Sequence, residues 1–242
     1  MEGPLQRRRV AVDTRASAEI GAIVAVNRAV AEAVRAASNA GSLPVVLSRD
    51  CNSALGTLAG IGNAEIGVVW FDAHGDYNTP ESSPSGFFDG MTLSVAVGDC
   101  HREVWARTGG RTFLSPARIL LAATRDLDPL EKPRVERSEV QVAGAGGWDT
   151  FEAKLETLAS RAAELYLHVD LDAIDPVEAP GVGFPAPGGF TEAQIAEAIA
   201  QIGRRFRIRA AAFTNYDAAR DTGGKTAALT GRLLETVLLA SA

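Results

Sequence analysis

The sequence predicts an α/β protein, a three-layer α/β/α sandwich in which helices cover both faces of a mainly parallel sheet. Short apolar runs typical of β-strands alternate with alanine-rich helical stretches along the chain, as expected of successive βαβ units. The run Ile66–Phe71 (IGVVWF) is apolar throughout, which is typical of a strand buried on both faces of a parallel sheet. With 242 residues and no visible linker or repeat, we expect a single domain spanning residues 1–242.

The first half of the chain is expected to alternate helices with strands. The opening helix is predicted over Ala18–Ala40, because its apolar residues lie on or near one face and Gly41 follows as a stop signal. In chain order, the next elements are a strand, a helix, a strand, a helix and a strand, at Leu43–Leu47, Ser53–Ile61, Ile66–Phe71, residues 91–97 and Ala117–Ala123.

The second half continues the alternation. A helix over Leu127–Glu136 and a weak strand over Val140–Val142 come first. Asp149 is a predicted N-cap for a helix that runs to about Arg161. Another helix begins at Thr191, where a glutamine three places on completes a capping box. Two strands and a closing helix are predicted at Leu165–Val169, Phe206–Phe213 and Lys225–Ala240.

Composition excludes several classes of protein. The net charge of −6 argues against nucleic-acid binding, which needs clustered Lys and Arg. Two cysteines do not make a disulfide framework, so we expect a reducing, cytoplasmic environment. No apolar run approaches the roughly 20 residues that cross a bilayer, and the N-terminus lacks the apolar core of a signal peptide. A membrane protein is therefore not expected.

Two aspartate-rich segments, each directly after an apolar strand, carry the predicted chemistry. These are DAHGD (residues 72–76) and DLDAIDP (residues 170–176). Open α/β sheets bind ligands at the carboxyl ends of their strands, where both segments are expected to lie. Alternate residues of a near-extended chain point to the same side, which brings together Asp72, His74 and Asp76 in one segment and Asp170 and Asp172 in the other. A lone Asp-x-Asp is usually a turn or cap, but two such segments indicate a site.

Converging carboxylates require a cation. Four or more of them repel one another and stay ionised only if positive charge neutralises them. Carboxylate oxygens with one imidazole suit Mn²⁺, with Mg²⁺, Fe²⁺, Co²⁺ or Zn²⁺ as alternatives. This number of ligands indicates two ions per chain that share bridging carboxylates and a hydroxide nucleophile.

The segments FDAHGD and VDLDAIDP resemble the two signature motifs of the arginase (ureohydrolase) family, and the resemblance runs from about residue 48 to the C-terminus. It implies an arginase-like fold and a metal-bridging hydroxide that attacks a guanidine-type carbon. By this resemblance, Asp72 and Asp170 are expected to bridge both ions. Asp76 completes the ligands of one ion, and His74 and Asp172 complete those of the other.

Three further residues match positions that hold the α-amino acid end of an arginase substrate. Asn78 and Ser85 match residues near the α-carboxylate, and Asp128, in TRDLDP, matches the one near the α-ammonium group. Each alone is explained equally well by loop capping. Together they favour an α-amino acid such as arginine over agmatine, which has no carboxylate.

The first departure from the family pattern concerns a metal ligand. The family motif Gly-Gly-Asp-His reads Ser-Arg-Asp-Cys here (residues 48–51), so Cys51 stands where a histidine ligand is expected. A thiolate is softer than imidazole and adds a negative charge, which raises the pKa of the bridging water. Cys51 is either a metal ligand or a small buried residue. A cysteine here also resembles the branch of the family that hydrolyses Nω-hydroxyarginine.

Two more departures concern catalysis and substrate binding. Asp89, in GFFDGM, stands where arginases have a proton-shuttling histidine, and it serves there only if its pKa is raised. Surface solvation is an equal alternative, and Asp76 and Asp89 are the two candidate catalytic residues. Asn215 replaces the glutamate that pairs with the guanidinium, and a neutral amide cannot form that charged pair. Because N-hydroxylation makes a guanidine less basic, Asn215 favours hydroxyarginine, unless Asp217 reaches in instead.

The N-terminal region departs as well. Family members usually begin with a strand and a glycine-rich loop, whereas here the first helix begins near residue 18. The opening strand is therefore expected to be missing or shortened to Arg9–Val12.

The sequence thus predicts a binuclear-metal amidinohydrolase. Its substrate is expected to be L-arginine or Nω-hydroxy-L-arginine, cleaved to ornithine plus urea or hydroxyurea. The alternatives are hydrolysis of another guanidino or formimino compound, and a catalytically degenerate homologue that binds metal or amino acids. The resemblance also implies a homo-oligomer, a trimer or hexamer, as in other family members.

Overall fold

A single parallel sheet forms the centre of the molecule. The computed structural model of the chain describes residues 5–15, 18–144 and 146–241. In this part of the chain, six strands lie in the order β1-β6-β5-β2-β3-β4, and every neighbouring pair is parallel. The strands are β1 (Val45–Leu47), β2 (Gly67–Phe71), β3 (Ile119–Ala122), β4 (Gln141–Ala143), β5 (Glu164–Asp170) and β6 (Arg207–Thr214). The predicted mainly parallel sheet is confirmed.

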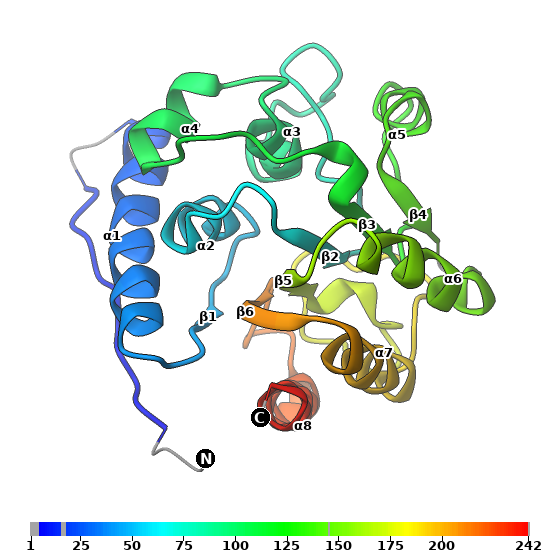
Figure 1. Cartoon of the computed structure of the whole chain (residues 1–242). Helices are drawn as coiled ribbons and strands as arrows, with labels where there is room; N and C mark the ends of the chain where they lie inside the picture. The colour runs from blue at the N-terminus through cyan, green and yellow to red at the C-terminus, as the bar shows by residue number, and fades with distance from the viewer. Residues whose placement is uncertain (1–4, 16–17, 145, 242) are drawn as a thin grey trace.

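Helices cover both faces of the sheet, which makes the three predicted layers (Figure 1). One face carries α1 (Glu19–Asn39), α2 (Ser53–Ile61), α3 (Thr92–Val97) and α4 (Arg102–Thr108). The same face also carries α5 (Lys132–Arg137) beside β4, with its Val135 buried in the core on that face. The other face carries α6 (Trp148–Ala159), α7 (Glu192–Arg205) and α8 (Lys225–Ala240). The helix α1 packs mainly on α2 and so lies outside it.

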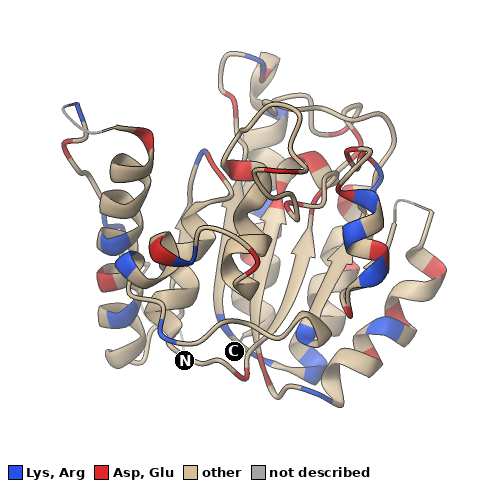
Figure 2. Cartoon of the chain, turned by 90° about the horizontal axis from the view of Figure 1, so that it is seen from above, with Lys and Arg blue, Asp and Glu red and all other residues tan. Residues whose placement is uncertain are grey.

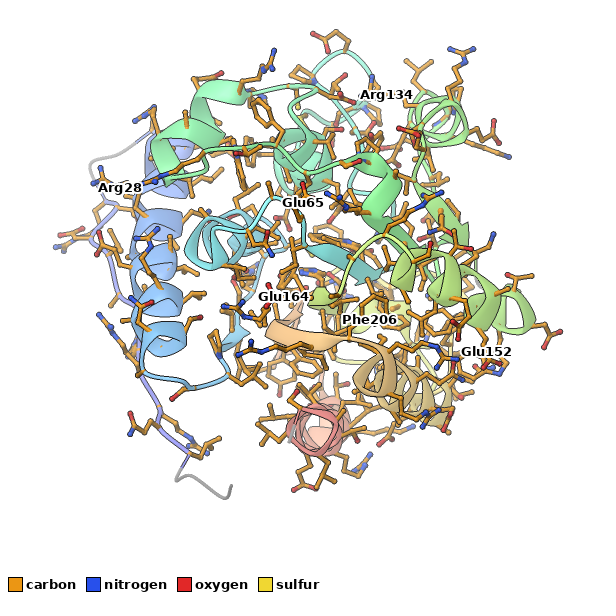
Figure 3. All side chains as sticks on the ribbon, in the orientation of Figure 1. Arg28, Glu65, Arg134, Glu152, Glu164 and Phe206 are labelled. Atoms are coloured by element: carbon orange, nitrogen blue, oxygen red, sulfur yellow. The ribbon has the colours of Figure 1, made fainter. Side chains whose placement is uncertain are left out.

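Two apolar cores separate the sheet from these helices. On one face, Phe151, Ile195 and Leu229 of α6, α7 and α8 pack against the strands, and Phe206, labelled in Figure 3, joins them. At the rim of this face, Arg205 at the end of α7 donates to Glu152 of α6 at 3.0 Å. Apolar side chains of α1–α4, including Leu55 of α2, form the core on the other face. Because both faces are covered, β2 is buried throughout, as its apolar sequence predicts.

Most predicted elements are confirmed to within a few residues. The predicted bounds of α2 and α8 match the structure, and Thr191 caps α7 through the predicted capping box with Gln194. The helix α5 begins at Lys132 rather than Leu127, because Pro133 fits the first turn but would break a helix that had started five residues earlier. The N-cap of α6 is Gly147, so Asp149 lies in the first turn instead.

Two features differ more clearly from the sequence prediction. The short helix α4 lay in a stretch for which no element was predicted, and its charged residues mask its periodicity. Arg9–Val12 forms no strand, so the shortened-strand alternative is wrong and β1 is the sheet edge in the described part of the chain. Leu47, the last residue of this edge strand, is 67% exposed.

The sheet register brings the two aspartate-rich segments together. The strands β2 and β5 are neighbours, with Phe71 paired to Val169, so Asp72 and Asp170 follow paired residues at the same edge of the sheet. On the other side of β5, Asp170 pairs with Thr214 at the end of β6. Figure 2 shows acidic segments beyond the arrowheads of the central strands. The predicted site therefore lies at the carboxyl ends of β2, β5 and β6.

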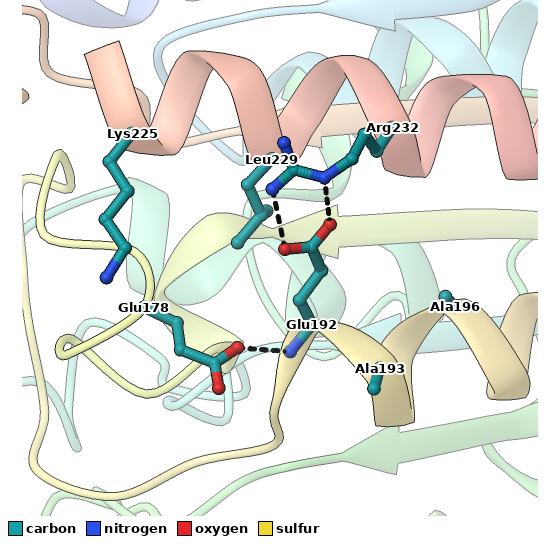
Figure 4. A pocket seen from close by; sticks show the side chains of 7 residues that line it. All are labelled: Glu178, Glu192, Ala193, Ala196, Lys225, Leu229 and Arg232. Atoms are coloured by element: carbon teal, nitrogen blue, oxygen red, sulfur yellow. Dashed lines mark hydrogen bonds and ion pairs between the residues drawn. The ribbon is translucent and has the colours of Figure 1, made fainter. Parts of the chain in front are cut away.

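A separate surface hollow lies between α7 and α8 (Figure 4). Across it, Arg232 of α8 forms a two-pronged ion pair with Glu192 of α7, whose backbone N–H donates to Glu178. None of the predicted site residues lines this hollow. Among the described residues, no helix combines the length and apolar character needed to cross a bilayer.

Candidate metal centre

Asp72, His74 and Asp172 meet at the centre of the site. The His74 Nδ1 atom lies 3.2 Å from Asp72 Oδ1 and 3.2 Å from Asp172 Oδ2. The backbone N–H of Ala73 donates to Asp172 Oδ1 at 3.0 Å and ties the two aspartate-rich segments together. The three side chains are close enough to share one metal ion. The structure thus assembles the predicted ligand group from β2 and β5.

Asp76 is held in the site by an unusual backbone conformation. Its φ is 48°, a left-handed value that Asp adopts more readily than most residues. The backbone carbonyl of Asp76 accepts the N–H of Leu93 in α3, which anchors the loop. The side chain is only 6% exposed, and its Oδ2 atom has no hydrogen-bond partner among the described residues. A buried carboxylate oxygen without a partner is costly, which is the condition that a bound cation relieves.

Cys51 also lies in the site, in the turn that begins α2. Its Sγ–H donates to Asp170 Oδ2 at 3.0 Å, and its Sγ lies 3.9 Å from Asp72 Oδ2. The thiol is also 3.3 Å from His168 Nε2 and 3.2 Å from Thr214 Oγ1. Cys51 is 4% exposed and contacts two predicted metal ligands, so it is part of the site.

His168 also belongs to the site. It lies two residues before Asp170 on β5 and is fully buried. Its ring stacks on Trp70, with centroids 3.6 Å apart, and its Nδ1 lies 2.9 Å from the Tyr166 hydroxyl. Trp70 in turn donates from Nε1 to Asp72 Oδ2 at 3.1 Å. One tryptophan therefore positions both a ligand aspartate and the histidine.

The electrostatics of the cluster require positive charge. Burial and the charge of Asp170 raise the pKa of Asp72, and burial with the charges of Asp72 and Asp89 raises that of Asp76. Burial, assisted by Asp172, raises the pKa of Asp170 to about 7. Burial opposes protonation of His74, but its hydrogen bonds to the carboxylates of Asp172 and Asp72 raise its pKa to about 12. Crowded oxygen donors with one imidazole fit divalent cations, so the residues present suit the predicted Mn²⁺.

Asn215 organises the aspartates of the second segment. Its Nδ2 donates to Asp170 Oδ1 at 2.9 Å and to Asp172 Oδ2 at 2.8 Å. Its Oδ1 accepts the backbone N–H of Gly183 at 2.9 Å. The residue adopts φ of 68°, which Asn tolerates better than Glu. Asp217 instead accepts the N–H of Ala219 and forms no contact with the site aspartates.

Asp89 lies half-buried against the start of α2. Its Oδ2 accepts the backbone N–H of Cys51 at 3.0 Å, and its Oδ1 accepts that of Asn52 at 2.6 Å. Burial raises the pKa of Asp89 to about 7. The surface-solvation alternative for Asp89 does not fit this placement, because the carboxylate caps the helix that carries Cys51.

Of the three predicted substrate-binding loop residues, two lie together. Asn78 Nδ2 donates to Asp128 Oδ2 at 2.8 Å, and Asn78 Oδ1 accepts the hydroxyl of Ser82 at 2.7 Å. Ser85 lies apart from this pair on an exposed turn, where its Oγ accepts the N–H of Phe87. An exposed serine and a fixed amide–carboxylate pair are the groups that the resemblance assigns to the two ends of an α-amino acid.

Glu131 supports the DAHGD loop, a role that the sequence does not predict. Its Oε1 accepts the N–H of Tyr77 at 2.8 Å, and its Oε2 accepts that of Asp128 at 3.2 Å. A Cβ added at Gly75 would lie 2.6 Å from Glu131 Oε1, so the loop can approach this carboxylate only with glycine there. Neither periodicity nor motif spacing signals such a contact, because it joins residues more than fifty positions apart.

Arg125 fixes the second loop and was also missed. Its guanidinium donates to five backbone carbonyls. They are those of Asp172 at 2.7 Å, Ala186 at 2.9 Å, Ala123 at 3.0 Å, Pro187 at 3.1 Å and Ala173 at 3.4 Å. This clamp orients the backbone that carries Asp172 without touching its carboxylate. The only sequence signal is a lone arginine after a predicted strand, which by itself indicates nothing.

Comparisons with known proteins agree on one family. A sequence model described as the arginase family matches residues 2–240. An arginase of Bacillus caldovelox is 33% identical over 88% of this chain and 74% of its own length, and one of Bacillus subtilis (strain 168) is 31% identical over 97% and 81%. The native structure of the Bacillus caldovelox arginase superposes with a TM-score of 0.85 at 32% identity, covering 97% of this chain and 81% of that one.

Proposed function

The chain belongs to the arginase family and is a hydrolase, and we propose that it cleaves a guanidine C–N bond of Nω-hydroxy-L-arginine or L-arginine. The products would be ornithine plus hydroxyurea or urea. The observation that carries the proposal is the meeting of Asp72, His74, Asp76, Asp170 and Asp172 at the carboxyl ends of the strands. A buried oxygen of Asp76 has no hydrogen-bond partner there among the residues that the structure describes. The Bacillus relatives named above are arginases, which supports a guanidino substrate.

We propose that these residues hold two Mn²⁺ ions per chain. Asp72 and Asp170 would be shared between the ions, with Asp76 and Cys51 on one side and His74 and Asp172 on the other. When bound, divalent ions activate water for attack and polarise the carbon that is attacked. The four aspartates and Cys51 are all buried, which supports this arrangement. Without cations, their negative charges would repel one another at close range.

Asp89 is proposed to move a proton during the reaction. Its burial raises its pKa to about 7, which suits a group that accepts and returns protons near neutral pH. It borders the site through the N–H of Cys51. Protonation of the leaving amine is the step that needs such a group, since a guanidine nitrogen leaves poorly without a proton.

The contacts of Asn215 favour Nω-hydroxy-L-arginine over L-arginine as the substrate. Its amide donors are directed at Asp170 and Asp172, and its oxygen accepts the N–H of Gly183. No carboxylate is therefore offered at this position to a guanidinium cation. A hydroxyguanidine is less basic than a guanidine. Its binding is therefore weakened less when Asn215 stands in place of a glutamate that would pair with a guanidinium.

Asn78, Ser85 and Asp128 are proposed to bind the α-amino acid end of the substrate. Asp128 would accept from the α-ammonium group, while Asn78 and Ser85 would donate to the α-carboxylate. The contact between Asn78 and Asp128 supports this assignment, since it places a hydrogen-bond donor for the α-carboxylate beside an acceptor for the α-ammonium group. Agmatine lacks the carboxylate and should be a poor substrate.

The proposal is tested by ornithine release from Mn²⁺-treated protein with each amino acid in turn. We expect turnover of both, faster with the hydroxylated substrate, and loss of turnover in Asp170→Asn. The matched control is Asp149→Asn, which makes the same change at an exposed position in the first turn of α6 and should keep full activity. Two bound metals without ornithine from either substrate would contradict the proposal and point to another guanidino or formimino compound.

A further inference from the structure

A soft metal-binding position is built into one side of the site. We infer that Cys51, Asp72 and His168 form a sulfur–oxygen–nitrogen position that prefers Zn²⁺ or Co²⁺ to Mn²⁺. The inference rests on the proposed function only in placing a metal centre here. It adds His168 as a ligand and makes the two metal positions chemically unequal.

The three ligand atoms are spaced for one small cation. Cys51 Sγ lies 3.3 Å from His168 Nε2 and 3.9 Å from Asp72 Oδ2, and the three side chains form one ligand-capable group. A tetrahedral Zn²⁺ with ordinary bond lengths holds its sulfur and nitrogen ligands about 3.5 Å apart. The observed 3.3 Å between Cys51 Sγ and His168 Nε2 is close to this value.

The histidine is oriented as metal-binding histidines usually are. The Tyr166 hydroxyl lies 2.9 Å from Nδ1, and when it accepts the Nδ1 proton the Nε2 lone pair faces Cys51. Trp70 stacks flat on the ring, with an interplanar angle of 6°, and also binds Asp72. These contacts hold two of the three ligands before a metal arrives, so little order has to be created on binding.

An unpartnered oxygen supplies a second, independent observation. Asp76 is 6% exposed, its Oδ2 has no partner in the described part of the chain, and its charge acts on Cys51. A cation beside Cys51 would give this carboxylate a counter-charge. The hydrogen-bonded thiol alone would not, because Cys51 already donates to Asp170.

The donor sets of the two positions differ in kind. Asp72, His74 and Asp172 offer two carboxylates and one imidazole, a set that suits Mn²⁺. Cys51 with His168 offers sulfur and nitrogen, a set that selects zinc and other late divalent ions. On binding, the Sγ–H bond of Cys51 is replaced by an Sγ–metal bond and the proton passes to the buffer.

The test uses Co²⁺ as an optical probe, so it does not depend on catalysis. Titration of the metal-free chain should develop a thiolate-to-Co²⁺ charge-transfer band that saturates at one equivalent. Cys51→Ser should abolish the band and lower Zn²⁺ affinity at least about tenfold, more than the loss of an outer hydrogen bond usually does. Cys100→Ser removes the other cysteine, which lies outside the ligand groups, and should keep the band.

His168 is tested by the same spectrum. His168→Asn should shift the cobalt bands and weaken binding at this position. Because His168 is fully buried and its replacement threatens folding, X-ray absorption of the Zn²⁺-bound wild type is the second measurement. It should find one sulfur and at least one imidazole nitrogen on zinc.

Two results would overturn the inference. One is Co²⁺ binding to wild type with no charge-transfer band, and the other is zinc coordinated by oxygen and nitrogen alone. Substrate hydrolysis without a thiolate-to-Co²⁺ charge-transfer band would support the proposed function and contradict this inference. The band without hydrolysis does the reverse.

Discussion

At the scale of single residues, the chemistry of the site depends on charges that are buried before any cation binds. Asp76 is the clearest case, with a buried oxygen that has no partner among the described residues. Its pKa is raised well above the ordinary value by burial and by Asp72 and Asp89. The position of this side chain therefore suits a bound cation and does not stabilise the metal-free fold.

Asp76→Asn is accordingly expected to stabilise the metal-free protein. Removing a buried, repelled charge should raise the free energy of unfolding by about 1–3 kcal/mol in urea denaturation with chelator at pH 8. With saturating Mn²⁺ the sign should reverse, because a ligand has been lost. Asp126→Asn, at an exposed position, should change neither value. Equal destabilisation of Asp76→Asn with and without metal would contradict this reading.

Glu131 gives a pH dependence with a definite sign. Burial raises its pKa from 4.5 to about 7, so between these values the folded state holds a proton that the unfolded state has lost. Its contribution to stability is present below about pH 4.5 and is lost as the pH rises to about 7. Glu131→Gln should flatten this part of the unfolding free energy against pH, measured without metal. An unchanged slope would show that Glu131 does not titrate in this range.

The residues of the site divide by how far they were predictable. Asp72, His74, Asp170 and Asp172 follow apolar strands at regular spacing, and parallel pairing of β2 with β5 brings them together. Asn215 was assigned to the substrate, yet its bonds to two aspartates depend on a left-handed turn after β6 that no pattern signals. The contact of His168 with Cys51 was also unpredictable, since side chains alone join β5 to the turn that begins α2.

At the scale of elements, local signals fixed some boundaries and long-range packing fixed others. The capping box of α7 depends only on Thr191 and Gln194, three positions apart in the sequence, so its start was predicted correctly. The start of α5 depends on Pro133 and on the contact of Glu131 with the end of the DAHGD loop. Periodicity alone therefore predicted a start that was too early. The helix α4 is too short and too charged for its buried face, Val104 and Trp105, to produce a readable pattern.

Thr191→Ala tests the element scale. The hydroxyl accepts the N–H of Gln194 at 3.1 Å, and its loss should lower the free energy of unfolding by about 1 kcal/mol. Metal content and activity should be unchanged, because α7 lies away from the site. Thr236→Ala on α8 removes only a bond to a carbonyl within its own helix and should cost less. A Thr191→Ala protein that loses metal would show that α7 positions the site.

At the scale of the whole molecule, the fold places negatively charged side chains together at the carboxyl ends of the strands of a sheet that is covered on both faces. Both apolar cores lie between the sheet and its helices, while the charged loops lie beyond the strand ends (Figure 2). The sequence predicted this layering because apolar strands alternate with helices. It did not settle the N-terminal region, where β1 proves to be the edge strand of the described chain.

Metal removal should therefore lower the stability of the whole fold. A free-ion concentration 100 times the Kd adds about 2.7 kcal/mol to the free energy of unfolding. For a chain of this size, that corresponds to a rise in Tm of roughly 5–11 °C. Calorimetry with Mn²⁺ and with chelator measures the difference, with Asp170→Asn as the variant that should show little change. Identical Tm values for wild type would contradict a bound metal.

We also propose that the chain assembles as a trimer or hexamer, as the family resemblance suggests. The exposed Leu47 on β1 and Leu239 on α8, at 67% and 80% exposure, are apolar positions that a partner copy would cover. Light scattering of the purified protein gives the mass directly. A monomer at micromolar concentration would contradict the proposal and leave the site unaffected.

The most direct test of the central claim is a competition between the two substrates in one reaction. Arginine and Nω-hydroxyarginine, labelled with different isotopes in the guanidine carbon, are mixed in equal amounts with Mn²⁺-treated protein, and the labelled products are followed by mass spectrometry. We expect ornithine from both substrates, and labelled hydroxyurea should accumulate faster than labelled urea, because Asn215 offers no charge to a guanidinium. Release of neither label by metal-bound protein would contradict the claim that this chain hydrolyses a guanidino amino acid.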